Sequence, residues 1–349
     1  MKKIVFAIAA LAMFAACTKT EVVEMAPKTA ISFGDSFVDN ATRAIDATLN
    51  NSNLDAFKVY GCVTWTDNGA NPVTSNTVNL YNGVEVKKDT PNTGAVTSGD
   101  WWYDGAYTQY WIEGNAYKFA AIVNGTAAFD KDANNLDNMP LTISYNAVGQ
   151  DDLLYAEHSV PSYATAVGSD VVKFTFSHLL SKVQFTFKNT MTSNTTTNMY
   201  TYRVSDIRIT NAYMDGTYTI GTGVWVADGT RAEVPFGNIT HDADTVETAI
   251  LVGAAGAVAS ATSHYSKLLI PNTYTDLQIT YTLETLLNDK VIDKDELVAN
   301  PASITLEAGH AYNFVLSKGN PGDTIKFELQ EVNAWNPATG GTDTPVQTL

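Results

Sequence analysis

One run of acidic and amide side chains has the spacing of a calcium-binding loop. Asp130, Asp132 and Asn134 occupy alternate positions, as the first three ligands of such a loop do. An EF-hand also needs glycine at its sixth position and glutamate at its twelfth, where this chain has Asn135 and Leu141. We therefore interpret the run as a solvated turn and predict no metal there.

Histidine and cysteine residues do not complete a catalytic site either. The run HDADT at 241–245 lacks the further, regularly spaced ligands that a zinc site needs. Glu157 and His158 are adjacent, so in a strand they point to opposite faces, which is poor geometry for joint acid-base work. Cys62 has no basic neighbour that would lower the pKa of its thiol. We predict no catalytic residue, no metal and no cofactor, and hence no enzyme.

The first residues, MKKIVFAIAALAMFAAC, carry an export signal. Lys2 and Lys3 form a positively charged start, an apolar run over 4–14 follows, and small residues precede Cys17. Because a membrane span needs about 20 apolar residues, we predict a signal peptide over residues 1–16. The end FAAC is typical of a lipoprotein box, in which Cys17 is acylated, and a plain secretory signal is the alternative. Two or three acyl chains, at about 0.8 kcal/mol per buried CH₂, would hold the protein on a membrane.

The segment WWYDGAYTQYW at 101–111 is rich in aromatic side chains. Aromatic rings next to carboxylates are groups with which many β-sandwich proteins bind sugars. The candidate glycan contacts are Trp101, Trp102, Tyr107 and Trp111. The alternative is that the rings of Trp102, Tyr110 and Trp111 fill the hydrophobic core.

Charge and hydrophobic pattern restrict the partners and the fold. A formal net charge of -16 and a pI near 4.6 argue against nucleic acid and anionic membrane surfaces as partners, because both require basic patches. Apolar and polar residues alternate in FKVYGCVTW, VVKFTF and KVQFTF, which are rich in strand-forming residues. The pattern predicts an all-β chain, in which only residues 284–300 could hold a helical turn or two.

The length of the chain after export predicts two domains. The run SVPSYATAVGSD at 159–170 is the clearest interruption between strand-like segments. We therefore expect an N-terminal β-sandwich over residues 44–168 and a C-terminal β-sandwich over residues 169–349, each of which buries one face of each sheet.

Six landmarks together have the order and spacing of a known family. They are the lipoprotein box, a first strand closing at ATRA, YWIEGNAYKFAA, DDLLYAEH, VVKFTFSHLLSKVQFTF, and ITLEAGHAYNFVL followed by VNAWNP. Between Cys17 and Pro337 the chain resembles the fimbrillins, the Mfa-like subunits of type V pili. The resemblance implies two transthyretin-like Greek-key β-sandwich domains in tandem. It also implies a structural, tip or accessory subunit of a fimbria that serves cell adhesion.

The resemblance gives a role to Arg43, one of only four arginines in the chain. Fimbrillins are exported as lipoproteins, and an arginine-specific or trypsin-like protease then cuts after the arginine that follows the first strand. Here the bond would join Arg43 and Ala44, and cleavage would release a lipidated propeptide, residues 17–43, with the strand around Ile31 and Phe33. The vacated groove would accept a strand from a neighbouring subunit. The alternative is an ordinary loop arginine.

The tail after Trp335, NPATGGTDTPVQTL, is a poor candidate for the donated strand. It offers only Val346 and Leu349 as large apolar residues, and it contains Pro345. Three interpretations stay open: donation by strands before Trp335, a place at a pilus end, or a surface lipoprotein that does not polymerise.

We therefore expect other pilus subunits as partners, in a homopolymer or a heteropolymer, together with a host glycan or protein ligand. The lipid would hold the precursor on the outer membrane before cleavage, and the mature protein would lie at the cell surface in a fimbrium. A second hypothesis is a surface lipoprotein that binds glycans, and a third is a β-sandwich hydrolase, for which the sequence offers no carboxylate pair.

Overall fold

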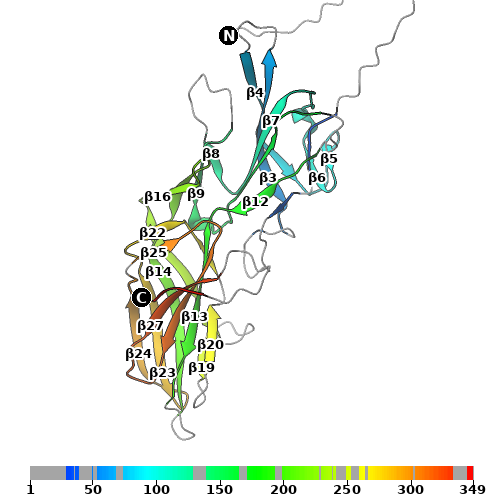
Figure 1. The fold of residues 1–349 in the computed structure, drawn as a ribbon. Helices are drawn as coiled ribbons and strands as arrows, with labels where there is room; N and C mark the ends of the chain where they lie inside the picture. The colour runs from blue at the N-terminus through cyan, green and yellow to red at the C-terminus, as the bar shows by residue number, and fades with distance from the viewer. Residues whose placement is uncertain are drawn as a thin grey trace, which may run out of the picture.

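The computed structural model is built almost entirely from β-strands (Figure 1). It describes residues 29–34, 36–38, 49, 53–67, 74–128, 139–164, 171–192, 199–227, 229–237, 239–240, 249–252, 259–263, 266–301, 303–332 and 344–348. In these residues the only helices are two 3-10 turns, η1 (Gly105–Tyr107) and η2 (Ala147–Gly149). The all-β class is thereby confirmed. The part of the chain that the structure describes contains no helix long and apolar enough to cross a membrane.

Strands from the first half of the chain form an N-terminal body, seen in the upper part of Figure 1. Its main sheet has eight strands in the order β2-β12-β10-β7-β3-β4-β6-β5. Their bounds are β2 (Phe37–Val38), β3 (Ala56–Asp67), β4 (Thr74–Lys87), β5 (Val96–Ser98), β6 (Trp101–Tyr103), β7 (Ala116–Val123), β10 (Leu154–Val160) and β12 (Thr175–His178). In addition, β1 (Ser32–Phe33) pairs in parallel with β11 (Val171–Val172).

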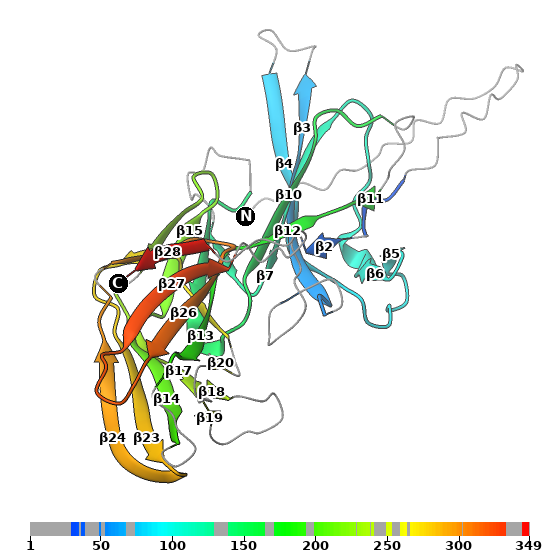
Figure 2. The same cartoon turned by 60° about the horizontal axis from the view of Figure 1, so that its bottom comes forward.

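Alternation along each strand decides which side chains this body buries. In β3, Phe57 and Val59 are buried, whereas Lys58 between them is exposed. The hairpin of β3 and β4 extends beyond the rest of the sheet (Figure 2), because β7 pairs with β3 only from Lys58 to Thr64. The part of the hairpin beyond Thr64 therefore has no neighbouring strand from β7.

The other strands form a C-terminal body with two main sheets. One has the order β18-β20-β13-β26-β27-β28, with β21 also on β13, and the other has the order β17-β14-β23-β24, with β19 also on β14. The bounds in the first are β13 (Ser181–Asn189), β18 (Ile239–Thr240), β20 (Ala259–Ser263), β21 (Lys267–Leu269), β26 (Ala311–Lys318), β27 (Lys326–Val332) and β28 (Thr344–Thr348). Those in the second are β14 (Tyr200–Tyr213), β17 (Arg231–Gly237), β19 (Ala249–Val252), β23 (Ile279–Leu287) and β24 (Lys290–Ala299).

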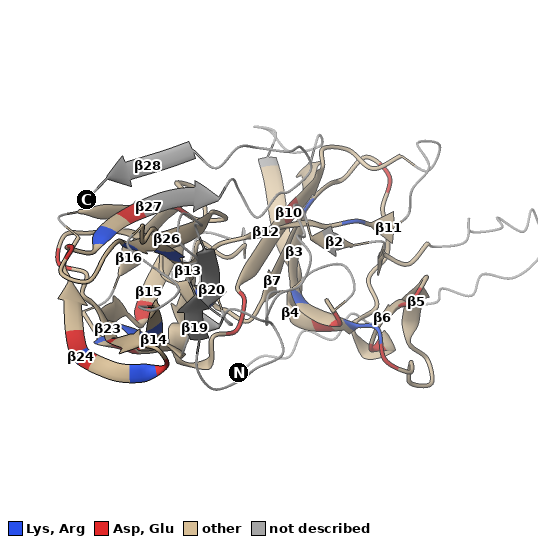
Figure 3. Ribbon diagram, turned by 90° about the horizontal axis from the view of Figure 1, so that it is seen from below, with Lys and Arg blue, Asp and Glu red and all other residues tan. Residues whose placement is uncertain are grey.

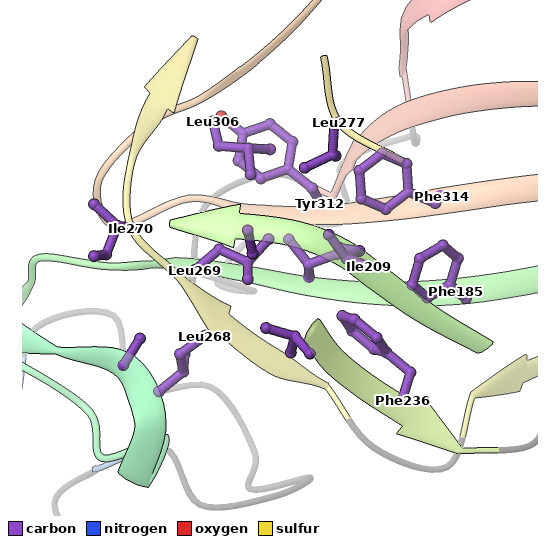
Figure 4. Close-up of a cluster of buried hydrophobic side chains, with 14 of the residues drawn as sticks. Phe185, Ile209, Phe236, Leu268, Leu269, Ile270, Leu277, Leu306, Tyr312 and Phe314 are labelled. Carbon is purple, nitrogen blue, oxygen red and sulfur yellow. The ribbon is translucent and has the colours of Figure 1, made fainter. Parts of the chain in front are cut away.

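Aromatic and aliphatic side chains fill the space between these two sheets (Figure 4). Phe185 of β13 meets Phe236 of β17 edge to face, with ring centroids 4.7 Å apart, and stacks on Phe314 of β26 at 5.2 Å. Edge-to-face and offset stacked rings are the favourable arrangements of aromatic pairs. The two sheets of the C-terminal body thus share one packed core, to which Tyr60, Ala120 and Ile122 of the N-terminal sheet also belong.

A smaller sheet connects the two halves of the chain. Its order is β16-β15-β9-β8, with β8 (Thr126–Ala128), β9 (Thr142–Asn146), β15 (Asp215–Thr219) and β16 (Val224–Ala227). A further pair joins β22 (Asn272–Tyr274) to β25 (Ile304–Leu306). Because β9 pairs with β15 from Thr142 to Asn146, a strand from the first half of the chain contributes Ile143 and Tyr145 to the core of the C-terminal body.

The change from one body to the other does not fall at residue 169. After the run 159–170, β11 and β12 pair with β1, β2 and β10, and Phe174 and Phe176 are buried in the core of the N-terminal body. Pairing between segments distant in sequence therefore places the change of body between β12 and β13. The Greek-key order of each body stays a prediction.

The expectation of a helical turn in residues 284–300 is wrong. These residues lie in β23 and β24, which form a hairpin whose turn residues Asn288 and Asp289 have φ values of 48° and 62°. Asn and Asp tolerate this left-handed region, which two-residue hairpin turns require. The charged sequence of β24, visible as alternating red and blue in Figure 3, suits an edge strand that is exposed over most of its length.

Three charged residues form a row across β14, β23 and β24. Glu284 lies opposite Arg203 and Lys294, with oxygen to nitrogen distances of 2.8 Å and 2.9 Å. The hydrogen bond from Lys294, together with the charges of Lys294 and Arg203, holds the pKa of the Glu284 carboxyl below its usual value, although desolvation opposes this. A carboxyl whose pKa is lower in the folded protein stabilises the fold above its unfolded pKa and loses that effect as the pH falls through the folded pKa.

Replacing Glu284 by glutamine should therefore reduce the loss of stability that the protein shows as the pH falls below neutral. We expect the urea midpoint of the Glu284→Gln variant to lie below that of the wild type at about pH 7 and to converge with it at about pH 3. Glu296→Gln is the matched control, because that carboxylate pairs with Arg208 but is 59% exposed and should matter less. An equal dependence on pH in Glu284→Gln and wild type would contradict this assignment.

Candidate functional site

The segment before the predicted cleavage point lies inside the N-terminal body. We call residues 29–38 the inserted segment; Asp35 within it lies outside the described residues. On one side β1 pairs with β11 and β2 pairs with β12, both in parallel. On the other side the amide of Ile31 donates to the carbonyl of Gln109 at 2.8 Å, and the amide of Trp111 donates to the carbonyl of Thr29 at 3.0 Å. The inserted segment is therefore hydrogen-bonded to the segment 109–111 at its start and to β11 and β12 at β1 and β2.

The apolar side chains of the inserted segment complete the core. Ile31 is 0% exposed, Phe33 1% and Val38 2%. The Phe33 ring lies within 6.0 Å, between centroids, of four other rings, those of Tyr81 in β4, Tyr103 in β6, Phe119 in β7 and Phe174 before β12. Burying three such side chains is worth about 4 to 9 kcal/mol, before the entropy of ordering the segment is subtracted.

A pair of buried tyrosines also holds the backbone of this segment. The hydroxyl of Tyr103 donates to the carbonyl of Ile31 at 2.6 Å and lies 3.3 Å from the hydroxyl of Tyr81. Burial raises the pKa of both Tyr81 and Tyr103, so both hydroxyls remain protonated in neutral and mildly alkaline solution. The bond to Ile31 is thus present over that whole pH range.

The chain is anchored a second time after the predicted cleavage point. The amide of Leu49 donates to the carboxylate of Asp152 at 2.9 Å, and Nδ1 of His178 lies 2.8 Å from the same oxygen. The Asp152 side chain is 0% exposed and that of His178 3% exposed. The segment 39–48 therefore joins two anchored points.

The residues predicted for processing lie outside the described residues. These residues are Cys17, Arg43 and Ala44. The runs at 130–138 and 241–245, which we interpret as loops without metal, also lie outside the described residues. Their assigned roles stay predictions. The predicted displaced strand, in contrast, is described, and Ile31 and Phe33 lie together in the core.

The candidate glycan contacts are mostly buried. Trp101, Trp102 and Trp111 are 3%, 6% and 7% exposed, whereas Tyr107 in η1 is 53% exposed. The ring of Trp101 packs against Phe57, that of Trp111 stacks on Tyr163 at 4.6 Å, and Nε1 of Trp102 donates to Asp89. This placement favours the alternative for Trp111, which joins the core cluster together with Trp101, and Trp102 is buried as well. Tyr110, which that alternative also placed in the core, is 45% exposed.

Sequence reasoning missed most of what surrounds the inserted segment. Tyr81, Tyr103 and Phe119 come from three different strands, and no spacing in the sequence connects them with Phe33. Glu157 and His158 lie in β10, and Cys62 is buried in β3. Within the described residues, no three His, Cys, Asp or Glu side chains gather as metal ligands would.

Removing the Phe33 ring should destabilise the N-terminal body. We expect Phe33→Ala to lower the free energy of unfolding by about 3 to 5 kcal/mol, because a buried ring is lost and its four neighbours cannot close the gap completely. Tyr107→Ala, which removes an exposed aromatic side chain nearby, should change it by about 0.5 kcal/mol or less. Urea denaturation of both full-length variants measures the difference. Equal effects would mean that Phe33 is not a core residue.

Two kinds of comparison with known proteins give matches. A family model described as fimbrillin-like matches residues 42–335. The solved structure of a fimbrial protein from Bacteroides vulgatus is similar at 15% sequence identity and a TM-score of 0.53, over 80% of this chain and 93% of that one. A fimbrial assembly protein from Parabacteroides distasonis is similar at 12% identity and a TM-score of 0.36, over 83% of this chain and 91% of that one.

None of the curated proteins compared with the chain matches it. The likeness to the Bacteroides vulgatus protein concerns the fold, because its sequence identity is low. The family model, however, spans most of the 349 residues. The chain therefore belongs to the fimbrillin-like family.

Proposed function

We propose that this protein is a structural, tip or accessory subunit of a type V pilus and serves cell adhesion, without catalytic activity. It assembles at the cell surface by protease-gated strand exchange. The observation that carries the proposal is the inserted segment, which precedes Arg43 in sequence and fills the core of the N-terminal body. The fimbrillin-like family and the fold shared with a fimbrial protein support the same function.

Cleavage between Arg43 and Ala44 would change how the inserted segment is held. In the precursor the segment is covalently joined to the body, which keeps its effective concentration high. After cleavage it is a separate peptide that can dissociate. The residues after the cut remain covalently part of the body, and Leu49 keeps its hydrogen bond to Asp152. The lipidated residues 17–43 then leave, and the groove is open to another strand.

The other three arginines lie in strands of the C-terminal body, which favours Arg43 as the cleavage site. Arg203 and Arg208 lie in β14, which pairs with neighbours on both sides. Arg231 lies in β17, and its guanidinium binds Asp276 at 2.8 Å. Because proteases cleave extended, accessible segments, an arginine-specific protease could reach these three bonds only after local unfolding.

The lipid on Cys17 would hold the precursor on the outer membrane until the cut. Cys62 is buried in β3 and is the sole other cysteine of the chain, so it does not compete for acylation. Loss of residues 17–43 removes the lipid and the inserted segment together. Membrane release and opening of the groove are thereby coupled to one cleavage.

Replacing Arg43 should block both release and assembly. We expect an arginine-specific protease to cut the native precursor once, after Arg43, so that mass spectrometry finds the loss of residues 17–43. Arg43→Ala protein should stay full length in the membrane fraction and be missing from surface filaments. Arg231→Ala is the matched control and should be cut and assembled like the wild type. A cut elsewhere, or Arg43→Ala in filaments at the normal level, would refute protease gating.

Replacing Cys17 should separate the anchor from the rest of the protein. We expect Cys17→Ser protein to lose labelling by a fatty-acid analogue and to leave the membrane fraction, whereas Cys62→Ser should label like the wild type. Labelling followed by fractionation measures both. Retained label in Cys17→Ser would exclude the lipid anchor at this residue.

A further inference from the structure

We infer that the groove of the N-terminal body accepts only a strand with a branched aliphatic residue, an aromatic residue two positions later, and glycine directly after the aromatic. The inference further assigns the incoming strand to a different polypeptide, because this chain has no free segment of that kind. It rests on the proposed strand exchange and names the partner of that site. The three positions are those now filled by Ile31, Phe33 and Gly34.

The position of Gly34 has no room for a side chain larger than a methyl group. A Cβ atom there would lie 2.7 Å from Oγ and 3.1 Å from Cβ of Ser98 in β5, and 3.1 Å from Cγ1 of Val171 in β11. Van der Waals contact between such atoms normally begins at about 3.5 Å. A methyl group could be accepted if Ser98 shifts slightly, but a branched side chain would push β5 and β11 apart. Glycine at this point therefore fixes the register of any strand in the groove.

The two preceding apolar positions are both buried. The Phe33 position is enclosed by the rings of Tyr81, Tyr103, Phe119 and Phe174, so an aromatic side chain fills it and a small one leaves a cavity. Ile31 is fully buried, and its carbonyl receives the hydroxyl of Tyr103. Because side chains alternate along a strand, one residue of slip would turn both apolar side chains out of the core.

The chain itself offers no free match to this pattern. In the tail over 333–349 the aromatic residue is Trp335, which is followed by asparagine, and the glycines at 340 and 341 follow threonine. Outside the inserted segment, the sequence VPFG at 234–237 matches the pattern, with an aliphatic residue, an aromatic residue two positions later and then glycine. That match lies in β17, where Val234 and Phe236 are buried in the core of the C-terminal body. It is therefore not available to a neighbouring copy.

The test uses the full chain as an unlipidated Cys17→Ser precursor, cut after Arg43 and freed of its propeptide. Four labelled peptides are titrated against it by fluorescence anisotropy: residues 28–39, the same peptide with Phe33→Ala, the same peptide with Gly34→Val, and the tail 336–349. We expect saturable binding of the first peptide. Phe33→Ala should bind roughly 100-fold more weakly, and Gly34→Val and the tail should show no saturable binding.

A complementary change in the groove checks the register directly. Ser98→Gly removes both atoms nearest the Gly34 position, so the cut Ser98→Gly protein should bind a Gly34→Ala peptide better than the cut protein with Ser98 does. Binding of the native peptide by Ser98→Gly shows that this variant is folded. No such gain would overturn the steric assignment of Ser98.

The outcomes distinguish a failure of strand exchange from a failure of the sequence requirement of the groove. If the native peptide does not bind the cut protein, the strand exchange itself fails. If the native peptide binds and Gly34→Val binds equally, strand exchange stands and the glycine rule is wrong. If the tail peptide binds as well as the native one, the donor is a second copy of this chain, and the assignment to a different polypeptide is overturned.

Discussion

The contact between the Phe33 ring and its four aromatic neighbours is the interaction around which the N-terminal body is organised. The neighbours come from β4, β6, β7 and the segment before β12, which meet at this ring from different parts of the chain. Because protein interiors are close-packed, the space cannot stay empty without a large loss of stability. The body therefore needs an inserted strand, and the chain supplies one from its own N-terminal end until another replaces it.

The same arrangement explains how a single peptide bond can control the core. The inserted segment is anchored before Arg43 by β11, β12 and Tyr103, while Leu49 is anchored after it by Asp152. Cleavage between these anchors leaves each contact intact at first and removes only the covalent connection. The aromatic contacts around Phe185 belong to a second cluster, which also includes Tyr60, Ala120 and Ile122 from strands of the N-terminal sheet. The inserted segment belongs to the first cluster, so its loss acts on the N-terminal core directly.

Much of this could be predicted from local sequence, and the rest depended on contacts between distant segments. Alternation identified strands such as those in FKVYGCVTW and KVQFTF, because one-sided burial imposes a period of two, and the family resemblance pointed to Ile31 and Phe33. Alternation failed for β24, an edge strand whose charged residues need no apolar face. The loop at 159–170 did not mark the change of body, because β11 and β12 after it pair with strands of the N-terminal body. The tryptophans at 101, 102 and 111 are chemically suited to sugars, and only the fold shows that their rings are buried.

Amide hydrogen exchange with mass spectrometry, on the precursor and on the cleaved protein freed of its propeptide, measures whether the inserted segment closes the N-terminal core. We expect slow exchange at β11 and at the Trp111 amide in the precursor, where the inserted segment covers them. After cleavage and removal of the propeptide, exchange should become fast at both places, while β13 and β26 of the C-terminal core stay protected. Unchanged protection of β11 and Trp111 would contradict the claim that the inserted segment closes the N-terminal core.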